Sequence, residues 1–245
     1  MYHDVRHLKI CASKGIRIEK ISTIIDFGCG DGERVYQLRD LGYDRTYGYN
    51  KSDYMGEVAP AKLRHPSDRQ WFRYSSNGTL PWMDNSVDLI ISDQVFEHVR
   101  DQEMAFVEQY RVLKRGGTAV HIIPAKWRII EPHIMVPLGG LNPFKERWWF
   151  YLWARLGVRN HWQKAKGTSA EVVAAENAHY ARTCLNYLSC RQYRRLLSRI
   201  GFSHTWEESL YMAQSSRPLI RALAKVPFAA SLIRTFVQRA LLLRK

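Results

Sequence analysis

The sequence predicts an α/β protein built on a doubly wound, mostly parallel sheet, and three stretches of the chain support this fold class. Residues 21–41 contain an apolar run, a glycine-rich turn and a helical pattern. Residues 87–92 form a nearly continuous apolar run, and residues 104–123 read as a helix, two glycines and another apolar run. Strands that are apolar throughout are typical of parallel sheets, because helices cover both of their faces.

The glycine-rich turn follows the first expected strand, residues 21–27, and precedes a helix over residues 33–41. Glycines there let the backbone approach a ligand closely, and the start of the helix presents free N–H groups. The spacing differs from the G-x-G-x-x-G of dinucleotide-binding turns, and the carboxylate of Asp26 suits a cationic group better than a pyrophosphate. The residues expected at this ligand site are Asp26, Gly28, Cys29, Gly30 and Gly32.

The second expected strand covers residues 45–50 and ends at Asn50, 20 residues beyond Gly30. At that distance, the tip of the second parallel strand carries the residue that binds ribose hydroxyls. An asparagine amide can both accept from and donate to hydroxyls, but it lacks the charge that strengthens such bonds. Lys51 suggests the 2′-phosphate of NADP as a rival ligand, which we discount because the first turn lacks the dinucleotide spacing.

The later elements complete the pattern. The strand over residues 87–92 is followed at its carboxyl end by Asp93-Gln94-Val95-Phe96-Glu97-His98-Val99, where ligands bind in open α/β sheets. The helix over residues 104–113 is expected to stop at Gly116 and Gly117, before a strand over 118–123. A helix over 187–201 with Ser189 as its N-cap then leads into a strand over 202–206.

These segments together resemble the class I S-adenosylmethionine (SAM)-dependent methyltransferases of the type 11 group. The resemblance rests on D-F-G-C-G-D-G, L-P-W-M-D-N-S-V-D-L-I, Q-V-F-E-H-V and V-L-K-R-G-G-T, and it covers about residues 20–125 and 187–207. It implies a Rossmann-like, seven-stranded sheet and SAM as the cofactor.

The resemblance also implies roles for particular residues. Asp26 would hold the methionine ammonium of SAM, and Asp93 and Gln94 would line the methyl side. Asn50 would contact the ribose, although the family pattern G-x-D-x-S has an acid there and this chain reads Gly48-Tyr49-Asn50-Lys51-Ser52. Ser76 and Asn77 stand where the family reads the adenine, usually with an aspartate.

Composition sets limits on the class of protein. The 245 residues are 46% hydrophobic, so we expect one globular domain with a core, an insertion or lid over 124–187 and a tail over 209–245. The four scattered cysteines indicate reduced, cytosolic usage without a zinc site, and we expect no metal. No signal peptide and no membrane-spanning run is recognisable, so we expect a cytoplasmic protein, with peripheral attachment to the inner membrane face as an extension.

The insertion and the tail carry the residues that we expect to select the substrate. Five of the eight tryptophans lie in the insertion, where they would either pack its own core or help it close over the ligand crevice. The last 37 residues have seven basic side chains and no acid. We expect two amphipathic helices on either side of Pro227, lying on anionic lipid or packed on the sheet, with a late strand within 236–243 as the alternative.

Methyl transfer from SAM needs little covalent help from a protein, so the acceptor must mainly be positioned. His98 and His133 are the candidate bases for an acceptor proton, although His98 is also typical of a structural histidine bonded to a carbonyl. We expect a small-molecule, lipid-linked or glycan acceptor, methylated on oxygen. The net charge of +14 makes nucleic acid, chiefly RNA, the competing substrate, but the chain lacks an Asn/Asp-Pro-Pro-aromatic motif and a Pro-Cys pair. A binding subunit without catalysis is the other alternative, motivated by Asn50.

Overall fold

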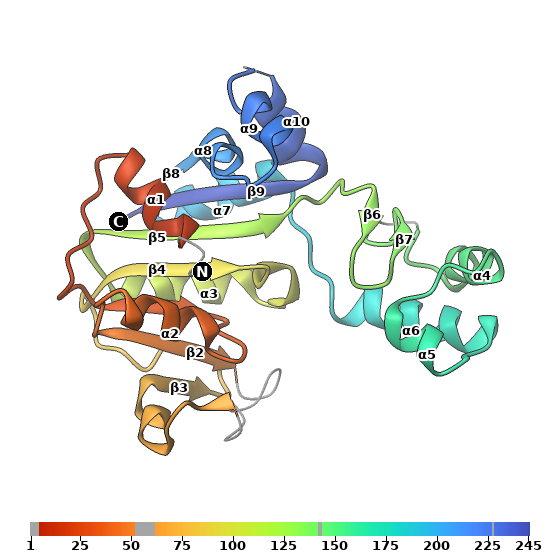
Figure 1. The fold of residues 1–245 in the computed structure, drawn as a ribbon, viewed down its shortest axis with the longest axis horizontal. Helices are drawn as coiled ribbons and strands as arrows, with labels where there is room; N and C mark the ends of the chain where they lie inside the picture. Colours follow the sequence, from red (N-terminus) through yellow and green to blue (C-terminus); the bar gives the residue numbers. More distant parts are fainter. Residues whose placement is uncertain (1–4, 52–61, 142–143, 227) are drawn as a thin grey trace.

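The computed structural model describes residues 5–51, 62–141, 144–226 and 228–245. Its main body is a seven-stranded sheet in the order β3-β2-β1-β4-β5-β9-β8, in which only β9 runs antiparallel to its neighbours (Figure 1). The strands are β1 Ile24–Phe27, β2 Thr46–Lys51, β3 Phe72–Ser75, β4 Val87–Asp93, β5 Leu113–Pro124, β8 Ser203–Trp206 and β9 Gln238–Arg244. The predicted doubly wound sheet is confirmed.

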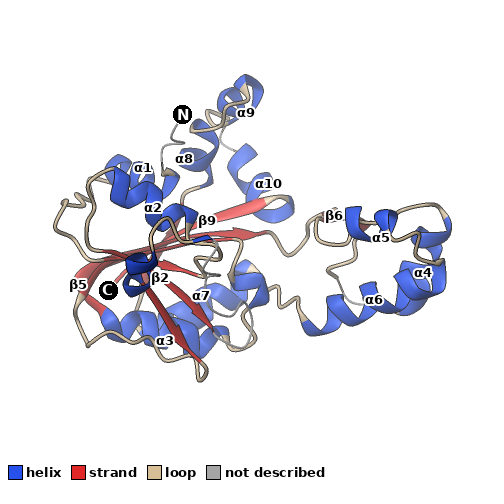
Figure 2. Cartoon of the chain, turned by 60° about the horizontal axis from the view of Figure 1, so that its bottom comes forward, coloured by secondary structure: helices blue, strands red, loops and turns tan. Residues whose placement is uncertain are grey.

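Helices cover both faces of this sheet, as Figure 2 shows. Apolar residues of α3 and α7 form one core with alternate strand residues such as Ile25 and Ile90. Residues of α1, α2 and α8 pack with the intervening ones, such as Ile24 and Ile91, on the other face. The bounds are α1 Arg6–Ser13, α2 Glu33–Asp40, α3 Gln102–Val112, α7 Cys190–Ile200, α8 Glu208–Ala213, α9 Pro218–Leu223 and α10 Ala229–Phe236, with 3₁₀ turns η2 Pro66–Trp71 and η3 Phe96–His98.

The ends of α7 and α3 test the caps that the sequence predicts. Ser189 caps α7 by accepting a hydrogen bond from the Gln192 N–H, and Gly201 ends the helix with φ +108°. The glycine stop expected for α3 is wrong, because α3 ends at Val112 and Gly116 and Gly117 already belong to β5. Strand β5 begins directly after α3, because Leu113 already pairs with Val87 of β4. A bulge then shifts the register between the two strands before the regular pairing from Leu89 with Thr118.

The tail contains both expected helices, α9 and α10; Pro227 itself lies outside the described residues. The helical reading is wrong from Gln238 on, where β9 forms and the alternative of a late strand holds. Residues 240–243 are buried on both faces of the sheet, between β5 and β8. A run of consecutive apolar residues is what a central strand requires, and here it outweighs the helical spacing.

The insertion forms a second lobe that projects from the carboxyl end of β5 (Figure 1). It contains β6 Ile130–Glu131, β7 Val136–Pro137, α4 Arg147–Arg155, α5 His161–Ala165 and α6 Ala170–Thr183. Phe150 is fully buried in an apolar core of its own, with Trp149 and Trp153 packed against it, whereas Trp148 and Trp162 are exposed. A role as a lid stays a prediction. No helix among the described residues has the length and apolar character needed to cross a membrane.

Candidate cofactor and acceptor site

The glycine-rich turn connects β1 to α2 at the carboxyl edge of the sheet. Gly32 has φ +81°, and a Cβ there would lie 2.5 Å from the ring of Phe72, so only glycine fits. Gly30 also has a positive φ, +54°, but a Cβ there would meet no atom within 4 Å. Gly32 is therefore needed for packing, while the backbone at Gly30 borders open space that a ligand can enter.

The Arg34 guanidinium lies between two carboxylates at this edge. It donates to Asp26 Oδ1 at 2.9 Å and lies 3.5 Å from Asp93 Oδ2. Asp26 is fully buried, and its Oδ2 has no hydrogen-bond partner among the described residues. Burial raises the pKa of Asp26 and of Asp93, and Arg34 partly offsets both shifts. The two carboxylates are thus arranged to hold a cationic group.

Asn50 lies at the end of β2, next to the turn. Its amide accepts from the Gly30 N–H and donates to the Gly30 carbonyl, both at 3.1 Å, and the side chain is buried. An ionised aspartate could make only the first of these bonds, because it has no donor. The asparagine therefore fastens the turn to β2, and its predicted ribose contact is not tested by this geometry.

Other residues expected to bind the cofactor lie around the same strand ends. The Cys29 thiol is buried against Gly48, and burial raises its pKa, so it packs as a small apolar group. Gln94 follows β4 with φ +56°, and its N–H donates to the Ile122 carbonyl. Lys51 is exposed at the end of β2.

Ser76 and Asn77 are exposed just after β3, the edge strand of the sheet. Asn77 Oδ1 accepts from Thr79 N at 3.0 Å and so shapes its own loop. Their adenine contact stays a prediction. Ser52, the last residue of the quoted ribose pattern, lies outside the described residues.

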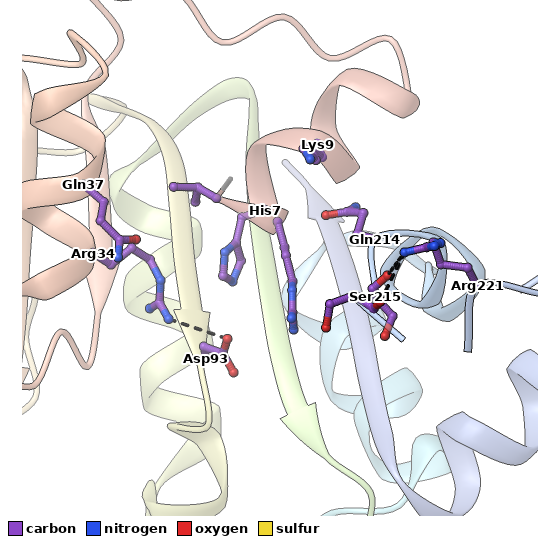
Figure 3. Close-up of a pocket in the computed structure, with 11 residues that line it drawn as sticks. His7, Lys9, Arg34, Gln37, Asp93, Gln214, Ser215 and Arg221 are labelled. Carbon is purple, nitrogen blue, oxygen red and sulfur yellow. Dashed lines mark hydrogen bonds and ion pairs between the residues drawn. The ribbon is translucent and has the colours of Figure 1, made fainter. Parts of the chain in front are cut away.

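A cavity of about 390 Å³ opens beside Asp93, between α1, α2 and the α8–α9 segment (Figure 3). Asp93 is its one acid among the described lining residues, against four basic side chains. These are Arg6, Lys9, Arg34 and Arg221. The sequence analysis missed all four, because the contacts that bring α1, α2 and α9 to one cavity are tertiary and leave no local pattern.

His7 lies in the wall of this cavity and anchors α1 to the sheet. Its Nε2 is 3.0 Å from the Ser92 carbonyl, so the ring donates through Nε2. Ser92 Oγ is also hydrogen-bonded to Nδ1 of His121 at 2.8 Å. Burial lowers the pKa of each histidine to about 3, so both rings are neutral at pH 7.

The two candidate bases come together although 35 positions separate them in the chain. The rings of His98, in η3, and His133, between β6 and β7, are 4.9 Å apart. His98 Nδ1 bonds the Cys184 carbonyl at 2.8 Å, as the structural alternative for this residue requires. Glu97 belongs to the same cluster, because one of its carboxylate oxygens lies within 4.8 Å of a ring nitrogen of each histidine. Glu97 is fully buried, and burial raises its pKa to about 7. The sequence analysis did not single out Glu97, because its burial in the folded chain is not visible in the local sequence.

Comparison with known proteins agrees with this geometry. Residues 25–121 match a family model described as a methyltransferase domain. A probable SAM-dependent methyltransferase of Mycolicibacterium smegmatis is 33% identical over 125 residues, which are 51% of this chain and 45% of that protein. A sterol 24-C-methyltransferase of Pneumocystis carinii is 31% identical over 102 residues, 41% of this chain and 27% of that protein.

The chain therefore spans less than half the length of these two relatives. Among solved structures, a SAM-dependent methyltransferase of Mesorhizobium loti has the same fold, with a TM-score of 0.55, 15% identity and full coverage of both chains.

The described residues fit SAM as the cofactor. Asp26 and Asp93 already hold a guanidinium, which stands in for the cationic methionine end of SAM, and Asp26 keeps one oxygen without a partner. The open space at Gly30 gives the ligand access to the turn. Over residues 25–121, the chain is therefore similar to the class I SAM-dependent methyltransferases.

Proposed function

We propose that this chain transfers the methyl group of SAM to a small-molecule, lipid-linked or glycan acceptor, on oxygen. The observation that carries the proposal is the cation held between Asp26 and Asp93 beside the glycine-rich turn. When bound, SAM supplies a methyl group that its sulfonium has already activated. The residues of the chain then have to bind, orient and exclude water, and the Glu97–His98–His133 cluster is the candidate place for removing the acceptor proton.

Arg34 would have to leave Asp26 when the methionine ammonium binds, because both cations need the same carboxylate. The cavity gives Arg34 a place to turn, since it lines the wall next to Asp93. Binding of SAM would thus exchange one cation for another at a buried acid, which keeps Asp26 paired in both states.

Calorimetry with SAM and S-adenosylhomocysteine tests this part of the proposal. We expect both to bind the wild type and neither to bind Asp26→Ala. Asp44→Ala is the matched control, because Asp44 is an exposed acid outside the turn. Absence of binding to the wild type at millimolar cofactor would refute the methyltransferase proposal.

The acceptor is proposed to carry an anionic group, such as a phosphate or a carboxylate. Four basic side chains and one acid line the cavity beside Asp93, and such a balance attracts anions. Arg221 is fixed there by donating to the Ser215 carbonyl at 2.9 Å. Arg221→Gln should raise the KM for the acceptor without changing the Kd for SAM; an unchanged KM would contradict this role.

Attachment to an anionic membrane is supported by the α9–α10 segment. Leu219, Phe228 and Leu232 expose at least half of their side chains, and the segment holds no acid. Such a surface suits the boundary of a lipid bilayer. Replacing Leu219 and Phe228 by serine should abolish binding to phosphatidylserine vesicles, whereas replacing Ile21, equally exposed elsewhere, should not. Vesicle binding that survives the double substitution would contradict this surface.

A binding subunit without catalysis is the second candidate. Two observations favour it. The Asn50 amide is already hydrogen-bonded to the backbone of Gly30, and the Arg34 guanidinium already occupies the position beside Asp26 where the methionine ammonium would bind. The calorimetry separates the two candidates, because a chain that binds no cofactor cannot be the enzyme. Cofactor binding without turnover on any anionic acceptor would favour the binding subunit.

A further inference from the structure

We propose that Glu97, His98 and His133 form a binding site for one divalent transition-metal ion, of the zinc or ferrous type. Each residue offers one ligand atom, and these three atoms lie within 4.8 Å of one another. Glu97 and His98 come from η3, directly after β4, while His133 comes from the insertion. The ion would therefore join the sheet domain to the insertion, and its binding does not depend on SAM.

Both histidines are oriented as metal ligands usually are. His98 Nδ1 is 2.8 Å from the Cys184 carbonyl, an acceptor, so Nδ1 carries the proton. His133 Nδ1 is 2.6 Å from Glu131 Oε1, a carboxylate, which fixes the same tautomer. In this tautomer, the Nε2 atom of each ring carries a lone pair rather than a proton. A carboxylate or carbonyl behind a histidine is the typical support of a metal ligand.

The support behind His133 is itself built into the fold. Glu131 is buried, and its second oxygen accepts from the Tyr187 hydroxyl at 2.7 Å. Tyr187 is the last residue of the insertion, at the point where the chain returns to the sheet domain. A tyrosine, a glutamate and a histidine thus form one hydrogen-bonded chain that ends at the proposed ion.

Glu97 supplies an independent sign that a cation belongs here. Its side chain is fully buried, and neither carboxylate oxygen has a hydrogen-bond partner among the described residues. The nearest basic atom recorded is His98 Nε2, 3.9 Å from Oε1. A buried carboxylate without partners is costly and rare in native proteins, and a bound ion would remove that cost.

The donor set indicates the class of ion. Two imidazole nitrogens and one carboxylate suit zinc, ferrous iron and their neighbours, whereas calcium and magnesium prefer oxygen alone. At a tetrahedral ion with bonds of about 2.1 Å, two ligand atoms lie about 3.4 Å apart. The three ligand atoms here lie within 4.8 Å of one another, so the widest pair must close by up to about 1.4 Å. Rotation of the side chains can supply such a shift.

Three protein ligands leave at least one coordination position open. If the chain is a methyltransferase as proposed above, an acceptor hydroxyl bound at this position would lose its proton to water more readily. Joining η3 to the insertion would also hold the insertion in one position relative to the sheet. Both consequences follow from the same three ligands.

The test is titration of the chelator-treated full chain with Zn²⁺ by calorimetry, and with Co²⁺ by visible absorption. We expect one ion per chain. Glu97→Gln, His98→Gln and His133→Gln should each weaken binding by more than 100-fold, and Glu131→Gln by about 10- to 100-fold. His161→Gln is the matched control, because His161 is an exposed histidine of the same insertion and should leave binding unchanged.

The thermal unfolding of each metal-free variant shows whether a substitution has disrupted the fold. Glu97→Gln removes a buried charge that has no hydrogen-bond partner among the described residues, so its metal-free form should be at least as stable as the wild type. Loss of binding in a folded Glu97→Gln chain supports the site. No saturable ion in the wild type, or equal binding by Glu97→Gln, overturns it. Because no SAM is present, this failure is distinct from failure of the cofactor calorimetry.

Discussion

Replacing Arg34 by methionine should make the chain less stable and, at the same time, more responsive to SAM. Methionine keeps much of the length of the side chain but removes the charge that pairs with Asp26 and Asp93. The perturbation leaves Asp26 as a fully buried acid whose one recorded partner is gone. Two opposite effects follow from this single change.

The loss of stability can be bounded. Removing one partner of a buried ion pair costs about 3–5 kcal/mol. Asp26 can avoid that cost by binding a proton. At pH 7, which is about 3 units above an unfolded pKa of about 3.9, binding the proton costs about 4 kcal/mol, because each unit corresponds to about 1.36 kcal/mol. The cost is therefore capped near 4 kcal/mol, and we expect about 3–4 kcal/mol at pH 7.

The loss of stability in the variant should depend on pH. In the variant, the folded pKa of Asp26 lies above its unfolded value, so its contribution improves as pH falls toward that value. The difference between the wild type and the variant should shrink from pH 7 to pH 4. Urea unfolding at both pH values measures it, and a deficit that does not change with pH would refute the reasoning.

The cofactor response is measured by the shift in unfolding midpoint at saturating SAM. The variant should show the larger shift, because the methionine ammonium meets an acid without a competing guanidinium and restores the lost pairing. Asp26→Asn with Arg34→Met serves as the control, since it removes the acid as well. A SAM-induced shift no larger than that of the wild type would mean that Arg34 does not occupy the site of the ammonium.

Two further predictions concern the turn and the histidines under α1. Gly30→Ala should lower the free energy of unfolding by about 1–2 kcal/mol and abolish SAM binding in a folded chain, whereas Gly32→Ala should prevent stable folding, because its Cβ would meet Phe72. Thermal unfolding and calorimetry separate the two outcomes. A Gly30→Ala chain that binds SAM normally would contradict the first prediction. The pKa of His7 is about 3 in the folded chain, against the ordinary value of 6.5 that applies when the chain is unfolded. The contribution of the neutral His7 ring to stability is therefore fully present above pH 6.5 and is lost as the pH falls toward 3. His7→Gln should remove about 2 kcal/mol of the stability lost between pH 7 and pH 5, and an unchanged loss in urea unfolding would contradict it.

The fold could be predicted where residues close in sequence determine it. The glycine-rich turn, the cap at Ser189 and the apolar run of β4 each depend on local spacing, and each is found in the structure. β9 could not be assigned with certainty, because a strand buried on both faces and an apolar stretch of helix have similar patterns over seven residues.

The site was predictable in its residues but not in its pairings. Asp26, Asp93, His98 and His133 are recognisable from their positions after strands or in the insertion. That Arg34 would hold the two acids together, or that the insertion would bring His133 to Glu97, depends on the tertiary arrangement. Charge and burial at such contacts leave no trace in the local sequence.

The position of β9 has a consequence for the order of folding. It is synthesised after every other strand of the sheet, yet it lies between β5 and β8 and pairs with both. Until residues 238–244 have been made, β5 and β8 each lack the partner strand that they pair with in the folded sheet. The nascent chain must keep the edges of these strands from joining other chains until the last strand arrives. Closure of the sheet is therefore a late, long-range step, and the stage at which this protein is most exposed to aggregation.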